Sequence, residues 1–147
     1  MVLLFGLAAV ELVGVHPLYM KAHARSHEVI GAAIEVHRLK GPGLIESIYE
    51  KCMLREFELR EISTVSQRQV LIEYKGKTFE EGLRFDVLVD GCLLVEIKAI
   101  QEILPIHQAQ LFSYMKLMDV PLGLLINFHE MKLTDGIRRM LLPEANR

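Results

Sequence analysis

The chain has 147 residues, of which 51% are hydrophobic and 24% are charged, and its formal net charge is −2 at pH 7. This length predicts one domain with a sizeable core, and the composition is that of an ordinary soluble globular protein rather than a disordered or fibrous one. The charge excludes a strongly basic nucleic-acid-binding protein, so any affinity for nucleic acid has to come from a local basic patch.

The two cysteines, Cys52 and Cys92, are isolated from each other and lie in apolar runs. A disulfide framework needs more cysteines, and a zinc site needs paired ligands at close spacing. We therefore expect free buried thiols and a cytoplasmic location.

Residues 1–22 form an apolar N-terminal extension. A secretory signal should open with a basic residue, but the first Lys or Arg is Lys21. The run is short for a membrane-spanning helix and contains Glu11, so no membrane association is expected. Three interpretations stay open: an element that packs on the domain, a poor export signal, and an extension upstream of a natural start at Met20.

Two helices are expected next. The first covers about residues 26–39, with Ser26 as its N-cap and one buried face made of Ile30, Ala33, Ile34 and His37. Gly41-Pro42-Gly43 ends this helix, because proline cannot continue the hydrogen-bond ladder. The second helix covers about residues 44–60, with a buried stripe made of Ile45, Ile48, Tyr49, Cys52 and Met53.

Alternating apolar and polar residues then predict three strands, near residues 70–74, 83–89 and 92–99. Turns are marked by Lys75-Gly76 and Asp90-Gly91. A third helix is expected over about 105–118, with Pro105 in its first turn. An apolar strand buried on both faces follows at 122–128, and a short helix runs from Lys132 to a stop near Pro143.

The predicted order is α-α-β-β-β-α-β, without repeats or long linkers. It indicates an α/β fold with a mixed central sheet of about four or five strands flanked by helices, and with an acidic site at one edge. The domain is expected to cover residues 23–142, followed by a tail at 143–147.

Three charged residues lie inside the predicted strands. Asp86 is in one strand, and Glu96 and Lys98 are two positions apart in the next, so the latter two share a face. Burial of such groups costs several kcal/mol per ion unless each finds a partner, and Mg²⁺ or Mn²⁺ is a suitable partner for carboxylates. For Asp86 taken alone, a structural ion pair with Arg84 or Lys98 is the favoured interpretation, whereas Asp86, Glu96 and Lys98 taken together favour a site.

The Asp90-Gly91 turn decides whether the two carboxylates meet. A two-residue loop sets Asp86 opposite Val95 and turns Glu96 to the other face of the hairpin. A three-residue loop with a glycine bulge places Asp86 and Glu96 on a common face. We therefore predict the three-residue loop.

Asp86 followed by a hairpin and Glu96-Ile97-Lys98 resembles the signature of the PD-(D/E)xK nucleases, and residues 43–49 reproduce the GxxExxY motif that names one of their families. The resemblance covers about residues 26–140. Further matching segments lie at residues 30–37, 104–107 and 123–128. Two departures are Phe85 in place of the proline of the superfamily name and Lys40 where leucine often precedes Gly-Pro-Gly.

The resemblance implies a restriction-endonuclease-like core and a site that binds Mg²⁺ or Mn²⁺. Asp86 and Glu96 would hold the ion, together with the backbone carbonyl of Ile97. Lys98 would orient the attacking water and stabilise the developing charge on phosphorus. Glu46, on the helix before the sheet, would contact the metal directly or through water; a role as a solvated helix residue stays open.

Three residues of the third predicted helix are implied to support the site. Gln110 and Tyr114 match a Q-x-x-x-Y element of related nucleases, and His107 lies on the same helical face. Gln110 and Tyr114 would hydrogen-bond the site, and His107 would reach phosphate. By contrast, Tyr49 is expected to be a packing residue with a satisfied hydroxyl, and His37 a helix-face histidine.

The function implied is a nuclease that hydrolyses phosphodiester bonds, with DNA favoured over RNA as substrate and Asp86, Glu96, Lys98 and Glu46 as catalytic residues. The alternative is a non-catalytic module that binds nucleic acid or a partner protein on the same scaffold. Intact Asp86, Glu96 and Lys98 favour the enzyme, whereas the near-neutral charge and small size favour the module. A homodimer would reconcile the two by joining two half-surfaces.

Overall fold

The computed structural model describes residues 16–143, so the apolar segment 1–15 and the last four tail residues lie outside it. The elements are α2 (Tyr19–Lys40), α3 (Glu46–Leu59), β1 (Thr64–Tyr74), β2 (Lys77–Val89), β3 (Leu93–Lys98), α4 (Pro105–Met118), β4 (Leu122–Asn127), the 3₁₀ helix η1 (Leu133–Gly136) and β5 (Ile137–Leu141). None of the helices in this part of the chain has the length and apolar character that crossing a bilayer requires. The expected domain limits at 23 and 142 stay predictions.

The five strands form one mixed sheet in the order β1-β2-β3-β4-β5. Only β3 and β4 run parallel, and the other neighbouring pairs are antiparallel. The helix α4 connects the two parallel strands, as a crossover connection requires. The predicted α/β class is confirmed, and the arrangement is consistent with a restriction-endonuclease-like core.

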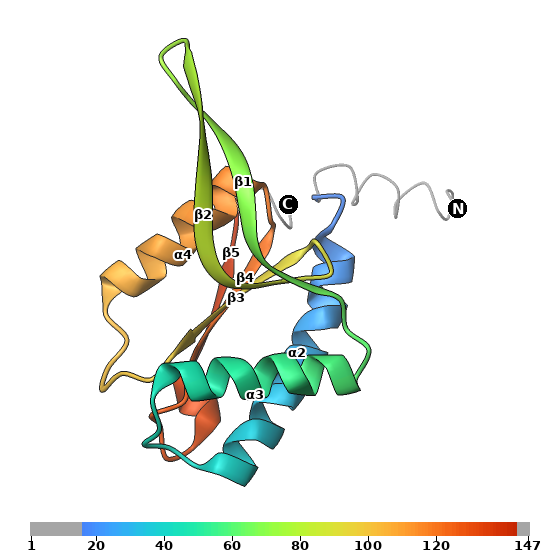
Figure 1. The fold of residues 1–147 in the computed structure, drawn as a ribbon, viewed down its shortest axis with the longest axis vertical. Helices are drawn as coiled ribbons and strands as arrows, with labels where there is room; N and C mark the ends of the chain where they lie inside the picture. Colours follow the sequence, from blue (N-terminus) through green and yellow to red (C-terminus); the bar gives the residue numbers. More distant parts are fainter. Residues whose placement is uncertain (1–15, 144–147) are drawn as a thin grey trace.

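Helices cover both faces of the sheet (Figure 1). α2 and α3 pack on one face around a core that includes Tyr49, Phe57, Val95 and Phe128. α4 covers the other face through Leu111 and the residues around it. β4 is buried along its whole length because both layers pack on it, as its apolar sequence predicts.

The first helix is longer than expected, and its buried face agrees with the prediction only in part, at Ala33 and the partly buried Ile30. It begins at Tyr19, and Ser26 lies inside it rather than at its N-cap. The Ser26 hydroxyl donates to the carbonyl of His23 at 2.6 Å, which is how a serine is accommodated in a buried helix interior. The face turned to the core consists of Ala22, Ser26, Val29, Ala32, Ala33 and Val36, whereas Ile34 is 45% exposed.

The stripe predicted for α3 is correct only in part. Tyr49 and Met53 are fully buried and Phe57 continues their row at a spacing of four residues. Ile45, which precedes the helix, and Ile48 are exposed, because α3 turns the row of Tyr49, Met53 and Phe57 toward the core.

The helix expected from Lys132 is wrong. η1 covers only Leu133–Gly136, and the chain then forms β5, which pairs antiparallel with β4. The apolar strand β4 needs a hydrogen-bonding neighbour at this edge, and this tertiary requirement overrides the weak local preference of the tail.

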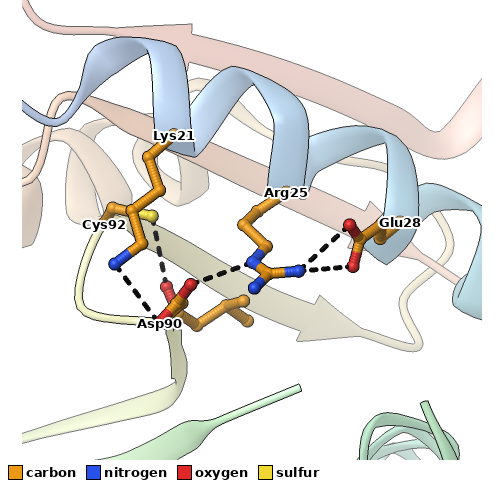
Figure 2. A network of polar contacts seen from close by, with 6 residues as sticks. Lys21, Arg25, Glu28, Asp90 and Cys92 are labelled. Carbon is orange, nitrogen blue, oxygen red and sulfur yellow. Dashed lines mark hydrogen bonds and ion pairs between the residues drawn. The ribbon is translucent and has the colours of Figure 1, made fainter. Parts of the chain in front are cut away.

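The hairpin between β2 and β3 has the predicted three-residue loop. Val89 is opposite Leu93, so Asp90, Gly91 and Cys92 form the loop, with positive φ at Asp90 and Gly91. The carboxylate of Asp90 is bound by Arg25 at 2.9 Å and by Lys21 at 3.3 Å (Figure 2). The loop that fixes the register of β2 and β3 is therefore fastened to α2.

β1 and β2 continue beyond the body of the protein as a two-stranded ribbon (Figure 1). The turn at its tip, Lys75-Gly76, is the predicted one, with positive φ at both residues and Tyr74 opposite Lys77. The ribbon part of β2 continues along the same strand into the segment that carries Asp86.

Candidate active site

Asp86 and Glu96 face each other where the ladder between β2 and β3 ends. Val87 opposite Val95 is the last paired position, and the register then sets Asp86 opposite Glu96. Beyond this point, side-chain oxygens replace backbone carbonyls as the acceptors between the two strands. The Asp86 N–H donates to Glu96 Oε1 at 3.2 Å, and the Ile97 N–H donates to Asp86 Oδ2 at 2.6 Å. The strands separate here and leave two carboxylates between them. Since β2 and β3 lie inside the sheet, the site is central, and the expectation of an acidic site at one edge of the sheet is wrong.

A hollow of about 270 Å³ opens on the α4 side of these strands. We call it the site hollow; its lining is Arg84, Asp86, Glu96, Lys98, His107, Gln110, Leu111 and Tyr114. The structure thus brings together six side chains that the sequence singled out, from three separate elements. Glu46 does not line this hollow.

Glu46 instead belongs to an acidic group on the α3 side. Carboxylate oxygens of Glu46, Glu50 and Asp86 lie within 4.8 Å of one another. Asp86 is shared between this group and the site hollow, whereas Glu96 is outside the group. Sequence reasoning missed Glu50, although its spacing of four residues from Glu46 places both on one helical face.

The buried position of these carboxylates favours their neutral forms. Burial, followed by the charge of Asp86, raises the pKa of Glu96 to about 7. Burial also raises the pKa of Asp86, against the opposing effects of the Ile97 N–H and the Lys98 charge. The pKa of Glu50 is raised as well, by burial and by the charges of Asp86 and Glu46. A nearby cation would oppose these shifts, because it favours the charged form of a carboxyl group.

The simplest structural alternative, an ion pair, is not seen at this site. Within residues 16–143 neither Asp86 nor Glu96 forms an ion pair with Arg84 or Lys98. The carboxylate oxygens are therefore not neutralised by an ion pair, and oxygen ligands of this kind suit a hard divalent cation such as Mg²⁺ or Mn²⁺. The backbone of Ile97 fits the same set, because a residue's N–H and C=O point to the same side of a strand and its N–H is turned to Asp86.

The supporting residues come from α4. His107 Nδ1 accepts a hydrogen bond from the Leu104 N–H at 2.8 Å, so the ring closes the first turn of the helix while it lines the hollow. Gln110 and Tyr114 line the same hollow one helical turn apart. Within the described chain neither of them hydrogen-bonds a site carboxylate, so the predicted bonds are not present in this structure.

Two further motif residues hold the surroundings in place. The buried Tyr49 hydroxyl donates to the Gly41 carbonyl at 2.6 Å and accepts from the Leu44 N–H at 3.1 Å, which matches the expected packing role and fixes the turn before Glu46. His37 contacts the Glu130 carbonyl at 2.8 Å, as expected for a histidine on a helix face.

Asn127 is a positioning residue that sequence reasoning did not single out. It is fully buried, and its side chain bonds both the N–H and the C=O of Ile100 and accepts from the His129 N–H. These bonds join the end of β4 to the segment that follows Lys98. A lone polar residue at the end of an apolar strand was the available signal.

Comparisons with known proteins gave a family match and a similar solved structure. A family model described as the PD-(D/E)XK nuclease superfamily matches residues 23–140. A search of curated proteins gave no match. Among solved structures, the crystal structure of SSO0001 is similar with a TM-score of 0.47 and 22% identity, over 64% of this chain and 47% of that one. The chain therefore spans about half the length of that protein.

Proposed function

Because the chain belongs to the PD-(D/E)XK nuclease superfamily, we propose that it is a metal-dependent nuclease that hydrolyses phosphodiester bonds, with DNA favoured over RNA. The observation that carries this proposal is the meeting of Asp86, Glu96 and Lys98 in one hollow. A second support is the raised pKa of both carboxylates, which is common at functional sites.

Asp86 is the central ligand in this proposal, since it faces both the site hollow and the acidic group on α3. Glu96 and the Ile97 carbonyl would complete the ligand set from β3, and Glu46 would contribute from α3. Bound Mg²⁺ or Mn²⁺ would supply charge neutralisation at the phosphate and a water of lowered pKa. Glu50 adds a carboxylate to this set from the next turn of α3.

The remaining residues have roles that do not involve the ion. Lys98 shares the hollow with both carboxylates, and its compact positive charge would orient the attacking water and stabilise charge that develops on the phosphate. His107 has its Nδ1 engaged by the helix start, which leaves Nε2 to donate to a phosphate oxygen. Gln110 and Tyr114 would position the substrate from the wall of the hollow.

Membership of the GxxExxY family within the superfamily is also a proposal. It rests on Gly43, Glu46 and Tyr49, of which Tyr49 fixes the turn that begins at Gly41 and Glu46 reaches Asp86. A homodimer or a complex with a partner protein stays a prediction, and gel filtration with light scattering tests it.

The test is cleavage of end-labelled single- and double-stranded DNA and RNA with Mg²⁺ or Mn²⁺. We expect Glu96→Ala and Lys98→Ala to lose cleavage by roughly a hundredfold or more, as for removal of a group that stabilises the transition state. Matched controls are Glu102→Ala and Lys132→Ala, which remove the same charges from exposed positions away from the hollow.

Calorimetry with Mn²⁺ separates the possible failures. Metal binding that is lost in Glu96→Ala but kept in Lys98→Ala supports the assigned roles. Absence of both cleavage and metal binding in the wild type contradicts the enzymatic proposal and leaves a nucleic-acid-binding or protein-interaction module on a nuclease scaffold.

A further inference from the structure

A second hollow lies on the ribbon next to the site. It has a volume of about 400 Å³ and is lined by six residues of β1 and β2, namely Gln67, Arg68, Gln69, Gly82, Leu83 and Arg84. We call it the ribbon hollow. Its lining contains two arginines and no acidic residue, which sets it apart from the acidic centre beside it.

The ribbon hollow and the proposed active site share lining residues. A third hollow, of about 370 Å³ against α3, shares Gln67 and Arg84 with the ribbon hollow and shares Arg84 and Asp86 with the site hollow. Arg84 therefore lines all three. A chain of phosphates that reaches Asp86 along this path passes over Arg84 first.

The two arginines of the ribbon hollow differ from the others in the described chain. Four arginines are held by carboxylates, namely Arg25, Arg38, Arg55 and Arg60. Arg138 donates to backbone carbonyls and Arg139 to Ser26 and His23. Arg68 and Arg84 have no hydrogen bond or ion pair within residues 16–143, and both are exposed. Their guanidinium groups are thus available to an external anion.

The remaining residues of the hollow shape it. Gln67 lies opposite Arg84, and Gln69 lies opposite Gly82, so these side chains and Arg84 share one face of the ribbon. A Cβ atom at Gly82 would come within 3.0 Å of Gln69 Nε2. Because Gly82 has no side chain, the Gln69 amide can lie over the Gly82 backbone, on the same face of the ribbon as Arg84.

We infer that the ribbon hollow binds the phosphodiester backbone of the strand to be cut, with Arg84 on a phosphate next to the scissile one and the Gln67 and Gln69 amides as uncharged donors on the same face. Arg68 pairs with Leu83 and starts from the other face of the ribbon, so it adds positive charge beside this row of donors. This rests on the proposed nuclease function. A chain of net charge −2 needs a local basic patch to bind nucleic acid, and the ribbon hollow would be that patch. The ribbon acids Glu73, Glu80 and Glu81 do not line the hollow.

The experiment measures binding of a fluorescein-labelled single-stranded DNA and of its duplex to the full chain. Anisotropy is recorded with Ca²⁺, at several salt concentrations, for wild type, Arg84→Ala and Arg68→Ala. We expect Arg84→Ala to bind roughly tenfold more weakly, since it loses a charge-assisted contact to phosphate. Arg68→Ala should lose less affinity, because Arg68 starts from the other face of the ribbon. The slope of log K against log salt should fall by about 0.7 to 0.9 per lost contact.

Two more variants test charge and shape separately. Arg138→Ala removes one positive charge from β5, at the opposite edge of the sheet, and should leave both affinity and slope unchanged. Gly82→Ala changes no charge but displaces Gln69, so it should weaken binding with an unchanged slope. If Arg84→Ala melts below the wild type, Arg84→Lys keeps the charge and should keep the slope while losing affinity.

The outcomes distinguish this inference from the proposed function. If the wild type binds and cleaves nucleic acid and Arg84→Ala leaves both unchanged, the inference is overturned and the proposed nuclease function stands. A wild type that neither binds nor cleaves any nucleic acid overturns both. Weaker binding with normal Mn²⁺ affinity in calorimetry supports the inference, because it shows that the metal site is intact in the variants.

Discussion

Glu96 accepts a hydrogen bond from the backbone N–H of Asp86, the residue that faces it across the β2–β3 hairpin. The second bond of this pair runs from the Ile97 N–H to the Asp86 carboxylate. The two acidic side chains thus continue the strand pairing by one step, and each is held in place by the other strand. A site of this kind is preorganised by the sheet, but it keeps two carboxylates close together in partly buried positions.

The first prediction concerns the free energy of unfolding of the metal-free protein as a function of pH. The folded-state pKa of Glu96 is about 7, above the ordinary value of 4.5. The folded state therefore binds more protons than the unfolded state, and stability falls as pH rises from about 4.5 through 7. The wild type should lose on the order of 2 kcal/mol of unfolding free energy over this pH range through Glu96. Glu96→Gln stays neutral, so it should not show this loss. Urea unfolding in EDTA at pH 5 and pH 8 measures it.

The control for this prediction is Glu102→Gln, at an exposed position in the loop before α4. It should leave the pH dependence of the wild type unchanged. A Glu96→Gln protein that loses as much stability between pH 5 and pH 8 as the wild type would show that Glu96 is ionised in the folded state throughout.

The second prediction concerns the loop that sets the register. The hydrogen bond from Arg25, with help from Lys21, holds the pKa of Asp90 below its usual range. A lowered pKa gives stability that is present above the unfolded value of 3.8 and is lost as pH falls through the folded value. Asp90→Asn, which tolerates the same positive φ, should lower stability by about 1 kcal/mol at pH 7 and by nearly nothing near pH 2.

Arg38→Ala is the matched control for this ion pair. Arg38 and Glu35 form a helix-surface pair whose side chains are 64% and 36% exposed, so its loss should change stability by about 0.3 kcal/mol. An Asp90→Asn effect equally small at pH 7 would mean that the loop does not depend on α2. Urea unfolding of both variants at the two pH values decides this.

The third prediction tests the turn before α3. Tyr49→Phe removes a hydroxyl that bonds both Gly41 and Leu44, and it leaves a half-buried donor and a half-buried acceptor without these partners. The cost should be about 1–3 kcal/mol. Tyr74→Phe, at a residue 65% exposed at the ribbon tip, should cost almost nothing. Equal melting temperatures for the two variants would contradict the role assigned to the Tyr49 hydroxyl.

The central part of the sheet and the meeting of its charged residues could be predicted from the sequence for a physical reason. The period of two in a strand is strict, so the loop length alone decides whether Asp86 and Glu96 share a face. The three-residue loop was chosen on that ground, and the structure has it. Pro105 at the start of α4 and the apolar run of β4 are equally local signals, and both elements lie where they were expected.

Features that depend on distant partners could not be predicted in this way. β5 forms because β4 offers it an edge, and the tail itself carries little strand signal. Ile34 and Ile48 are apolar but exposed, because Ala32 and Ala33 occupy the buried face of α2 and Tyr49 and Met53 that of α3. Glu50 is an ordinary helix residue in the sequence, and only the position of Asp86 reveals it.

The last prediction concerns Asn127, whose side chain bonds the Ile100 backbone on both sides and the His129 N–H. Asn127→Ala removes all three bonds at a fully buried position, so stability should fall by about 2–4 kcal/mol. The amides of Ile100 and His129 should exchange with solvent faster, whereas the Phe128 amide, which donates to the Lys98 carbonyl at 2.8 Å, should keep more of its protection. Gln101→Ala, an exposed neighbour of Ile100, is the control. Uniform loss of protection across β3 and β4 would contradict a local positioning role, because it would show that Asn127 supports the whole sheet rather than the segment behind Lys98.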